Sequence, residues 1–207
     1  NDKQIDSCLI SHAHQDHIGS LPFLIKKIPY VKIITTPQTR AIAELTLHNS
    51  VSILKKELDD EMFEFYSHDE IDLLIKMIEY KEYDKQFELN SYHQLKDSKV
   101  DVTFYDAGHV LGSAGILLEN NNHKIFYSGD INLTDQTIQS KAKLPKHKID
   151  TLILETTYGA TDSDLLLNWQ EESLRFAKEA NKILNNGGSI LIPVFSFLFL
   201  GGKCRYC

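Results

Sequence analysis

The stretch Ser11-His12-Ala13-His14-Gln15-Asp16-His17 places three histidines and one aspartate within six positions. His12 and His14 are two residues apart, so an extended or looping backbone can direct both imidazoles at one metal ion. Asp16 and His17 follow directly and can reach a second ion nearby. Imidazole and carboxylate ligands suit Zn²⁺, with Mn²⁺ and Fe as competitors. An exposed polar loop is the alternative interpretation, and the density of ligand types argues against it.

The flanking residues predict that this stretch connects a strand to a helix. Residues 5–10 end in an apolar run with residues that favour β-structure. After the stretch, apolar residues recur at helical spacing. These residues are Leu21, Leu24, Ile25 and Ile28. Because functional groups of α/β proteins often lie at the carboxyl ends of strands, we expect a ligand-bearing strand-to-helix loop.

A second candidate ligand, His109, follows another predicted strand. Residues 100–105 alternate like a strand and run into a glycine-rich segment that contains His109. The flanking glycines are Gly108, Gly112 and Gly115. They permit tight turns and a close approach of the backbone to a site. A lone histidine is usually structural or exposed, but this context makes His109 a predicted metal ligand. Asp106 has no assigned role, and we expect it to be structural.

Two acidic residues also follow predicted strands. Asp130 comes after residues 124–127, and Glu155 comes after residues 151–154, which have the composition of a buried strand. Taken alone, Asp130 is better explained by a turn or a helix cap. Glu155 alone is unremarkable. Any functional meaning of these two carboxylates depends on the order of all four segments.

Together and in this order, the segments resemble the metallo-β-lactamase superfamily. They resemble most closely its β-CASP branch of RNA- and DNA-processing nucleases, which includes the RNase J type and the cleavage and polyadenylation endonuclease. The matching strings are His12-Ala-His-Gln-Asp-His17, Asp106-Ala-Gly-His109-Val-Leu-Gly-Ser113, Ser128-Gly-Asp130 and Leu154-Glu-Thr-Thr-Tyr-Gly159. The last string discriminates the branch, although Thr156 stands where the family usually has serine. Residues 188–196 are similar to the strand that precedes the β-CASP insertion, so the resemblance runs from Ile5 to Ser196.

The resemblance implies both a fold and a site. The fold is α/β: an incomplete metallo-β-lactamase αββα sandwich, with helices packed outside two central β-sheets. The site is that of a hydrolase with two Zn²⁺, or Mn²⁺ as the alternative, in which metal-activated water attacks phosphorus. Asp16 and Glu155 are the implied catalytic residues, and Glu155 would orient a ligand histidine. The implied metal ligands are His12, His14 and His109 for the first ion, Asp16 and His17 for the second, and Asp130 for both.

The same resemblance predicts that the chain covers part of a larger protein. Residues 1–196 would form a partial metallo-β-lactamase-like domain, residues 197–207 an aberrant tail, and the β-CASP domain would be absent. The second metal would therefore lack one ligand, a histidine expected beyond position 200. The tail contains Cys204 and Cys207. Their spacing suits a metal or redox pair, but we interpret the pair as incidental at this terminus.

Composition limits the possible partners. The 22 Lys and Arg residues and 29 Asp and Glu residues give a net charge of −7. A negative net charge does not favour general nucleic-acid binding. The substrate backbone would therefore be held chiefly at the metals. The sequence shows no signal peptide or membrane span. Its three cysteines do not suggest a disulfide framework. We predict a cytoplasmic location, or a nuclear one in a eukaryote, without membrane contact.

The predicted function is metal-dependent hydrolysis of phosphodiester bonds in RNA processing, with this chain alone weak or inactive. RNA is the predicted partner, with single-stranded DNA as the alternative, and a homo-oligomer or a processing complex stays open. A small-molecule ester or thioester hydrolase of the superfamily would share the histidine string but would not be expected to carry residues 154–159. A non-catalytic RNA-processing subunit is the other alternative. Sequence does not separate endonuclease from exonuclease.

Two long helices are predicted between the first two ligand segments. Thr36 is the expected N-cap of a helix that reaches about Leu58, and a capping box at Ser67 opens a second helix to about Tyr83. The expected apolar positions of the first helix are Ile42, Leu45, Val51, Leu54 and Leu58. We interpret His48 and His68, on or beside these helices, as surface or structural residues because neither follows a strand.

Overall fold

The computed structural model describes residues 5–57, 66–89, 99–136, 139–162 and 169–192. It divides into two compact units, Asn1–Glu155 and Thr156–Cys207. The predicted tail 197–207, with Cys204 and Cys207, lies outside the described residues. Within the described ranges, no helix combines the length and apolar character needed to cross a membrane.

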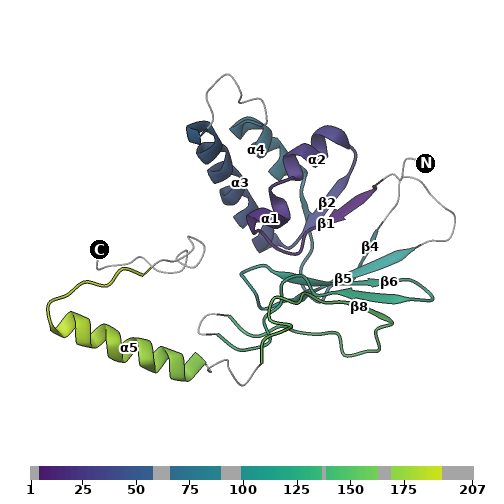
Figure 1. Ribbon diagram of the computed structural model, residues 1–207. Helices are drawn as coiled ribbons and strands as arrows, with labels where there is room; N and C mark the ends of the chain where they lie inside the picture. Colours follow the sequence, from purple (N-terminus) through teal and green to yellow (C-terminus); the bar gives the residue numbers. More distant parts are fainter. Residues whose placement is uncertain (1–4, 58–65, 90–98, 137–138, 163–168, 193–207) are drawn as a thin grey trace. The chain divides into compact units, whose positions relative to one another are not determined.

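The first unit contains a parallel sheet of three strands in the order β1-β2-β3. Its strands are β1 (Ser7–Leu9), β2 (Lys32–Thr35) and β3 (Glu79–Tyr80). Helices form the connections because neighbouring parallel strands need long crossovers. They are α1 (Gln15–Ile18), α2 (Leu21–Lys27), α3 (Pro37–Glu57) and α4 (His68–Met77), gathered on one side of β1 and β2 (Figure 1).

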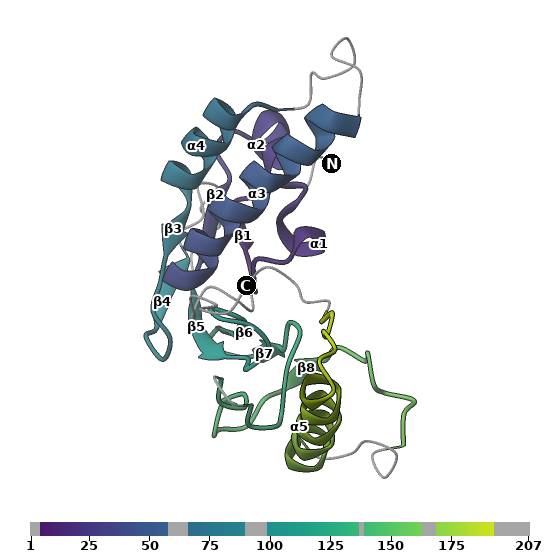
Figure 2. The same ribbon diagram turned by 90° about the vertical axis from the view of Figure 1, so that its left-hand side faces the viewer.

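The first unit also contains a sheet of five strands in the order β4-β5-β6-β7-β8. These strands are β4 (Phe87–Leu89), β5 (Val100–Asp106), β6 (Ala114–Glu119), β7 (Lys124–Tyr127) and β8 (Thr151–Ile153). Neighbours are antiparallel from β4 to β7, and β7 pairs in parallel with β8. Figures 1 and 2 show that β1 and β2 lie between this sheet and helices α3 and α4. The prediction of a mixed α/β fold with two sheets is confirmed.

A shared apolar core joins the two sheets. Ile34 of β2 packs into one cluster with residues of β5 and β6. The buried members of the cluster are Ile34, Val102, Phe104, Ala114 and Ile116. Side chains that alternate along each strand face this interface, as expected for sheets packed face to face. The core therefore fixes the strand ends of the two sheets relative to one another.

Helix α3 begins as predicted, and Ile42 and Val51 are buried as predicted, but Leu45 is not; Leu58 lies outside the described residues. Thr36 Oγ1 accepts a hydrogen bond from Thr39 N at 3.2 Å, which confirms the N-cap. The buried stripe repeats every four residues, through Thr39, Ala43, Leu47 and Val51. Leu45, predicted to face inward, is 52% exposed. It lies two positions from Ala43 and Leu47, and two positions rotate a side chain to the opposite face of a helix.

Helix α4 also begins as predicted and ends early. Ser67 Oγ accepts from Glu70 N, and Glu70 Oε2 accepts from Ser67 N at 2.6 Å, so the capping box is confirmed. The helix ends at Met77 rather than near Tyr83. Ile78 adopts an extended conformation, and the next two residues form β3 beside β2. Pairing with a sheet outweighs the helical pattern there.

One strand prediction is wrong in its burial, and another, for residues 188–196, is not confirmed in its described part, since residues 193–196 lie outside the described residues. Strand β8 was expected to be buried, but its three residues are exposed. It pairs only with β7 among the described residues, so it is an edge strand. In the second unit, helix α5 (Trp169–Asn185) is present. The segment 188–192 after it forms no strand, and no partner strand exists in the described part of that unit. An unpaired strand leaves its backbone groups without hydrogen bonds.

Replacing Ser67 with alanine should lower the free energy of unfolding by about 1 kcal/mol, because it removes the side-chain acceptor for the α4 backbone. Chemical denaturation monitored by circular dichroism measures this. Ser52→Ala is the matched control, since the Ser52 hydroxyl donates to the carbonyl of His48 inside α3 at 3.1 Å. Alanine favours helix interiors, so the control should be neutral or stabilising. Equal losses in both variants would contradict the importance of the cap.

Candidate metal centre

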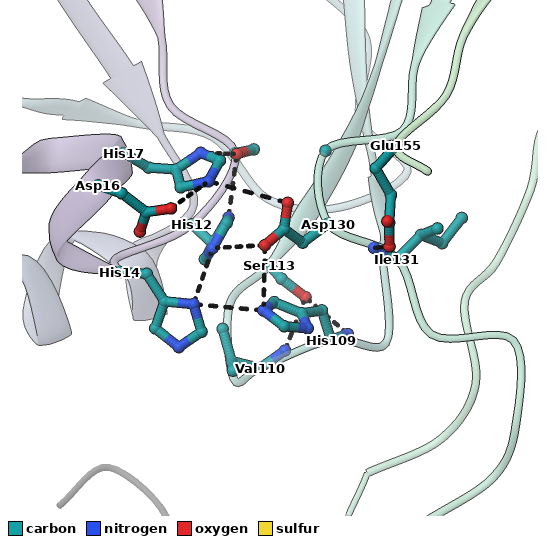
Figure 3. A network of polar contacts seen from close by, with 12 residues as sticks. His12, His14, Asp16, His17, His109, Val110, Ser113, Asp130, Ile131 and Glu155 are labelled. Carbon is teal, nitrogen blue, oxygen red and sulfur yellow. Dashed lines mark hydrogen bonds and ion pairs between the residues drawn. The ribbon is translucent and has the colours of Figure 1, made fainter. Parts of the chain in front are cut away.

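The predicted site residues come together at the carboxyl ends of strands from both sheets. His12 and His14 follow β1, while His109 follows β5. Asp130 follows β7, and its neighbour Glu155 follows β8. Asp16 and His17 lie within α1 rather than in the predicted loop, so the ligand string continues into a helix. Figure 3 shows the histidines and Asp130 pointing toward one another.

Four of these residues form one compact group of donor atoms. His12, His14, His109 and Asp130 each offer a donor, and all four donors lie within 4.8 Å of one another. His14 Nδ1 is 3.0 Å from His12 Nε2 and 3.3 Å from His109 Nε2. In tetrahedral coordination at about 2.0–2.1 Å, neighbouring donors lie about 3.3 Å apart. The donor set and its spacing therefore fit a divalent cation.

The Asp130 carboxylate faces two sets of side chains, one on each of its oxygens. Its Oδ2 atom is 3.6 Å from His12 Nε2 and 3.5 Å from His109 Nε2. Its Oδ1 atom is 3.8 Å from His17 Nε2, and the same nitrogen lies 3.5 Å from Asp16 Oδ2. His17 Nε2 thus lies near a carboxylate oxygen of both Asp16 and Asp130. The Asp130 carboxylate therefore presents a different oxygen to each set of donors.

Burial favours the uncharged, metal-binding form of His12 and His109. His12 is fully buried. Burial, and then the charges of three neighbouring histidines, lower the pKa of His12 from 6.5 to about 3. Burial also lowers the pKa of His109, against the opposing charge of Asp130. A neutral imidazole keeps a free lone pair, which a metal ligand requires.

Two serines support the histidines, and sequence analysis assigned neither. The Ser11 hydroxyl lies 3.1 Å from His12 Nδ1 and 3.4 Å from His17 Nδ1. These are the ring nitrogens that face away from Asp130, so Ser11 can fix which nitrogen carries the proton. Ser113 Oγ accepts from His109 N at 3.1 Å and Val110 N at 3.2 Å, and so it holds the His109 turn. Their only signal in the sequence was their place inside the ligand strings.

The two remaining acidic residues contact backbone. Asp106 Oδ1 accepts from Gly108 N at 2.9 Å, which confirms its structural role in the turn before His109. Glu155 Oε1 accepts from Ile131 N at 3.4 Å, beside Asp130 (Figure 3). The Glu155 charge also acts on His109, whose pKa it raises against the effect of burial. Glu155 therefore supports the segment that carries Asp130.

Residues 2–157 match the metallo-beta-lactamase superfamily domain. The chain belongs to the metallo-β-lactamase superfamily. Its relatives include the cleavage and polyadenylation specificity factor subunit 3 of Dictyostelium discoideum, with 31% identity over 93% of this chain and 23% of that protein. The endoribonuclease ysh-1 of Neurospora crassa is 35% identical over 93% of this chain and 22% of that protein.

A third relative of this superfamily member has a similar sequence identity to the chain. The RNase J-like protein of Methanocaldococcus jannaschii is 32% identical over 95% of this chain and 42% of its own length. These three relatives are β-CASP nucleases, so the resemblance inferred from the four strings is confirmed. The chain spans between a fifth and less than half of the length of these relatives.

Gly129→Ala should weaken zinc binding by about tenfold or more, the effect expected when supports of ligands are disturbed. Gly129 has φ +57°, and an added Cβ would lie 2.9 Å from Ser11 Cβ. The clash would separate Ser11 from the Asp130 segment of the metallo-β-lactamase site. Isothermal titration with Zn²⁺ measures the affinity.

Gly187→Ala is the control for this variant. Gly187 also has a positive φ, +74°, but an added Cβ would meet nothing within 4 Å. Both substitutions carry the backbone cost of about 1–2 kcal/mol of a left-handed residue. Only Gly129→Ala should change the zinc affinity. Equal affinities for the two variants would show that the contact with Ser11 does not support the site.

Proposed function

We propose that the protein to which this chain belongs cleaves phosphodiester bonds in RNA by metal-dependent hydrolysis. The observation that carries the proposal is the convergence of His12, His14, His109 and Asp130 on one point. The superfamily match and the printed names of the relatives, endoribonuclease and RNase J-like protein, support the substrate class. Because the chain spans 22–42% of these relatives, the proposal concerns the protein at its natural length.

The proposed ligands follow from the contacts. His12, His14 and His109 would hold the first ion, and Asp130 would contact both ions through its separate oxygens. Asp16 and His17 would complete the protein ligands of the second ion, which has one fewer than the first. Imidazole and carboxylate donors suit Zn²⁺, with Mn²⁺ as the alternative. Bound ions of this kind lower the pKa of water and polarise a phosphoryl oxygen.

The chain's own residues would prepare the site for this chemistry. The buried imidazole of His12 is neutral at physiological pH, so it need not lose a proton before it binds. The Ser11 hydroxyl would hold His12 and His17 in the required tautomers. Glu155 would keep the Asp130 segment in place through Ile131 N. Asp16, whose side chain is 78% exposed, would be the catalytic carboxylate that substrate and solvent can reach.

RNA fits the charge of the chain only if the ions do much of the binding. A net charge of −7 gives no general attraction for a phosphate backbone. The proposed cations would supply local positive charge at the cleaved bond. We infer a cytoplasmic or nuclear location, and a homo-oligomer or a processing complex as the setting, from the RNA-processing names of the relatives. Single-stranded DNA is the alternative substrate.

The test compares three substrates in parallel: single-stranded RNA, single-stranded DNA and the thioester S-lactoylglutathione. The protein at its natural length is assayed with Zn²⁺ and with Mn²⁺, beside an Asp130→Ala variant. We expect metal-dependent RNA cleavage that the variant lacks, and weak or absent activity from the 207-residue chain alone. Thioester hydrolysis without nucleic-acid cleavage would overturn the proposal in favour of a small-molecule hydrolase. Metal binding without hydrolysis of any substrate would indicate a non-catalytic subunit.

A further inference from the structure

A second cluster of metal-ligand side chains lies on helices α3 and α4, outside the centre described above. Glu44 and His48 are four residues apart on α3, and His68 and Asp72 are four residues apart on α4. Residues at this spacing share one helix face. Glu44, His48 and Asp72 each offer a donor, and these donors lie within 4.8 Å of one another. Two adjacent helices thus present ligand pairs to each other.

The packing of the two helices fixes these pairs. Arg40 Nε donates to the carbonyl of Ile75 at 3.0 Å. His48 meets His68, so contacts that advance along α3 move back along α4, and the helices are antiparallel. Leu47 and Ile71 are fully buried next to the cluster residues in sequence. The Ser67 capping box holds the first turn of α4, where His68 lies. These contacts therefore hold the backbone around the cluster in place without any metal.

His48 contacts a carboxylate through one ring nitrogen and a second histidine through the other, as a metal-bound histidine does. His48 Nε2 is 3.0 Å from Asp72 Oδ1, and His48 Nδ1 is 2.7 Å from His68 Nδ1. The His48 and His68 rings are stacked, with centroids 5.0 Å apart and planes 15° from parallel. If Nε2 binds a cation, Nδ1 keeps its proton and donates a hydrogen bond to His68 Nδ1. Metal-bound histidines commonly use their second nitrogen in this way.

We propose that Glu44, His48 and Asp72 form a Zn²⁺ site that ties α3 to α4, with His68 orienting His48. One imidazole and two carboxylates are three protein ligands suited to Zn²⁺, with an open position for water. The His48 side chain is 28% exposed and the Asp72 side chain 52% exposed, so an ion can enter from solvent. An ordinary His–Asp hydrogen bond would explain His48 and Asp72. That hydrogen bond would not explain why Glu44 lies close to His48 and Asp72, or why His68 contacts the second ring nitrogen of His48.

The test counts zinc equivalents by equilibrium dialysis of the metal-depleted full chain with Zn²⁺ as the only probe. We expect His48→Asn to bind one equivalent fewer than the parent chain. The matched control is His123→Asn, an exposed histidine whose Nε2 contacts Thr151 Oγ1 at 2.8 Å, and it should keep the full count. His68→Gln should keep the site with about 10–100-fold weaker binding.

Two further measurements keep the outcome clear. Glu44→Gln changes an exposed position and should also lose the equivalent, which covers the case in which His48→Asn folds poorly. Zn²⁺ should raise the melting temperature of an Asp130→Ala protein, but not that of Asp130→Ala combined with Glu44→Gln. An equal zinc count in the parent, His48→Asn and Glu44→Gln would overturn the proposal. That result would leave the central metal site and the proposed nuclease activity untouched.

Discussion

Asp130→Ala should lower the zinc affinity of the central site by more than 100-fold and reduce hydrolysis below detection. The Asp130 carboxylate lies within 3.5–3.8 Å of His12, His17 and His109, so both donor groups depend on it. Its removal would leave two cations to repel each other without an anion between them. Glu155→Ala should cost only about 10–100-fold, because Glu155 supports the segment through Ile131 N.

Competition with a zinc-binding dye measures both affinities, and RNA cleavage by the full-length protein measures activity. Asp135→Ala is the control: this carboxylate follows β7 in the chain and accepts from Lys141 N at 3.0 Å. It should match the parent in both assays. If Glu155→Ala proves the more damaging variant, Asp130 does not bridge the ions.

Phe104→Ala should lower the free energy of unfolding of the first unit by about 3–5 kcal/mol, the usual cost of removing a buried ring. Phe104 is fully buried in β5 and packs edge-to-face on Phe87, with ring centroids 5.4 Å apart. It also belongs to the cluster that joins β5 to Ile34 of β2. The cavity would therefore loosen the contact between the sheets whose ends carry the metal ligands.

Urea denaturation, with far-ultraviolet circular dichroism as the signal, measures this loss. Leu73→Ala on α4 is the control, because Leu73 is 60% exposed and its loss should change stability by about 0.5 kcal/mol or less. A loss below about 1 kcal/mol for Phe104→Ala would contradict the view that this core holds the two sheets together.

The sequence predicted those parts of the molecule where local chemistry and long-range packing agree. The His12–His17 string, the strands before His109 and Asp130, and the caps of α3 and α4 depend on spacing and on residue types. All of these appear in the structure. The gathering of His12, His14 and His109 was predictable because these candidate ligands are nearly consecutive or follow a strand directly. Asp130 and Glu155 were identified only through the resemblance of the four strings to the superfamily.

The incorrect predictions concern residues whose environment depends on partners distant in sequence. Strand β8 has a buried composition but lies at a sheet edge. The helical pattern after Met77 yields to pairing between β3 and β2. Periodicity and composition carry no information on such contacts.

His48 and His68 show the same limit on the helices. They are 20 residues apart, and each alone has the pattern of a surface histidine. Their contact and the approach of Glu44 and Asp72 become visible only when α3 and α4 are packed together. Sequence analysis had no strand-end motif by which to identify them.

Anomalous diffraction at the zinc absorption edge, from crystals of the zinc-loaded protein, would locate the bound ions. We expect the strongest anomalous peak between His12 Nε2, His14 Nδ1, His109 Nε2 and Asp130 Oδ2, with metal–nitrogen distances of about 2.0–2.1 Å. A weaker peak is predicted near Asp16, His17 and Asp130 Oδ1. Zinc bound elsewhere with no peak among His12, His14 and His109 would contradict the proposed ligand set.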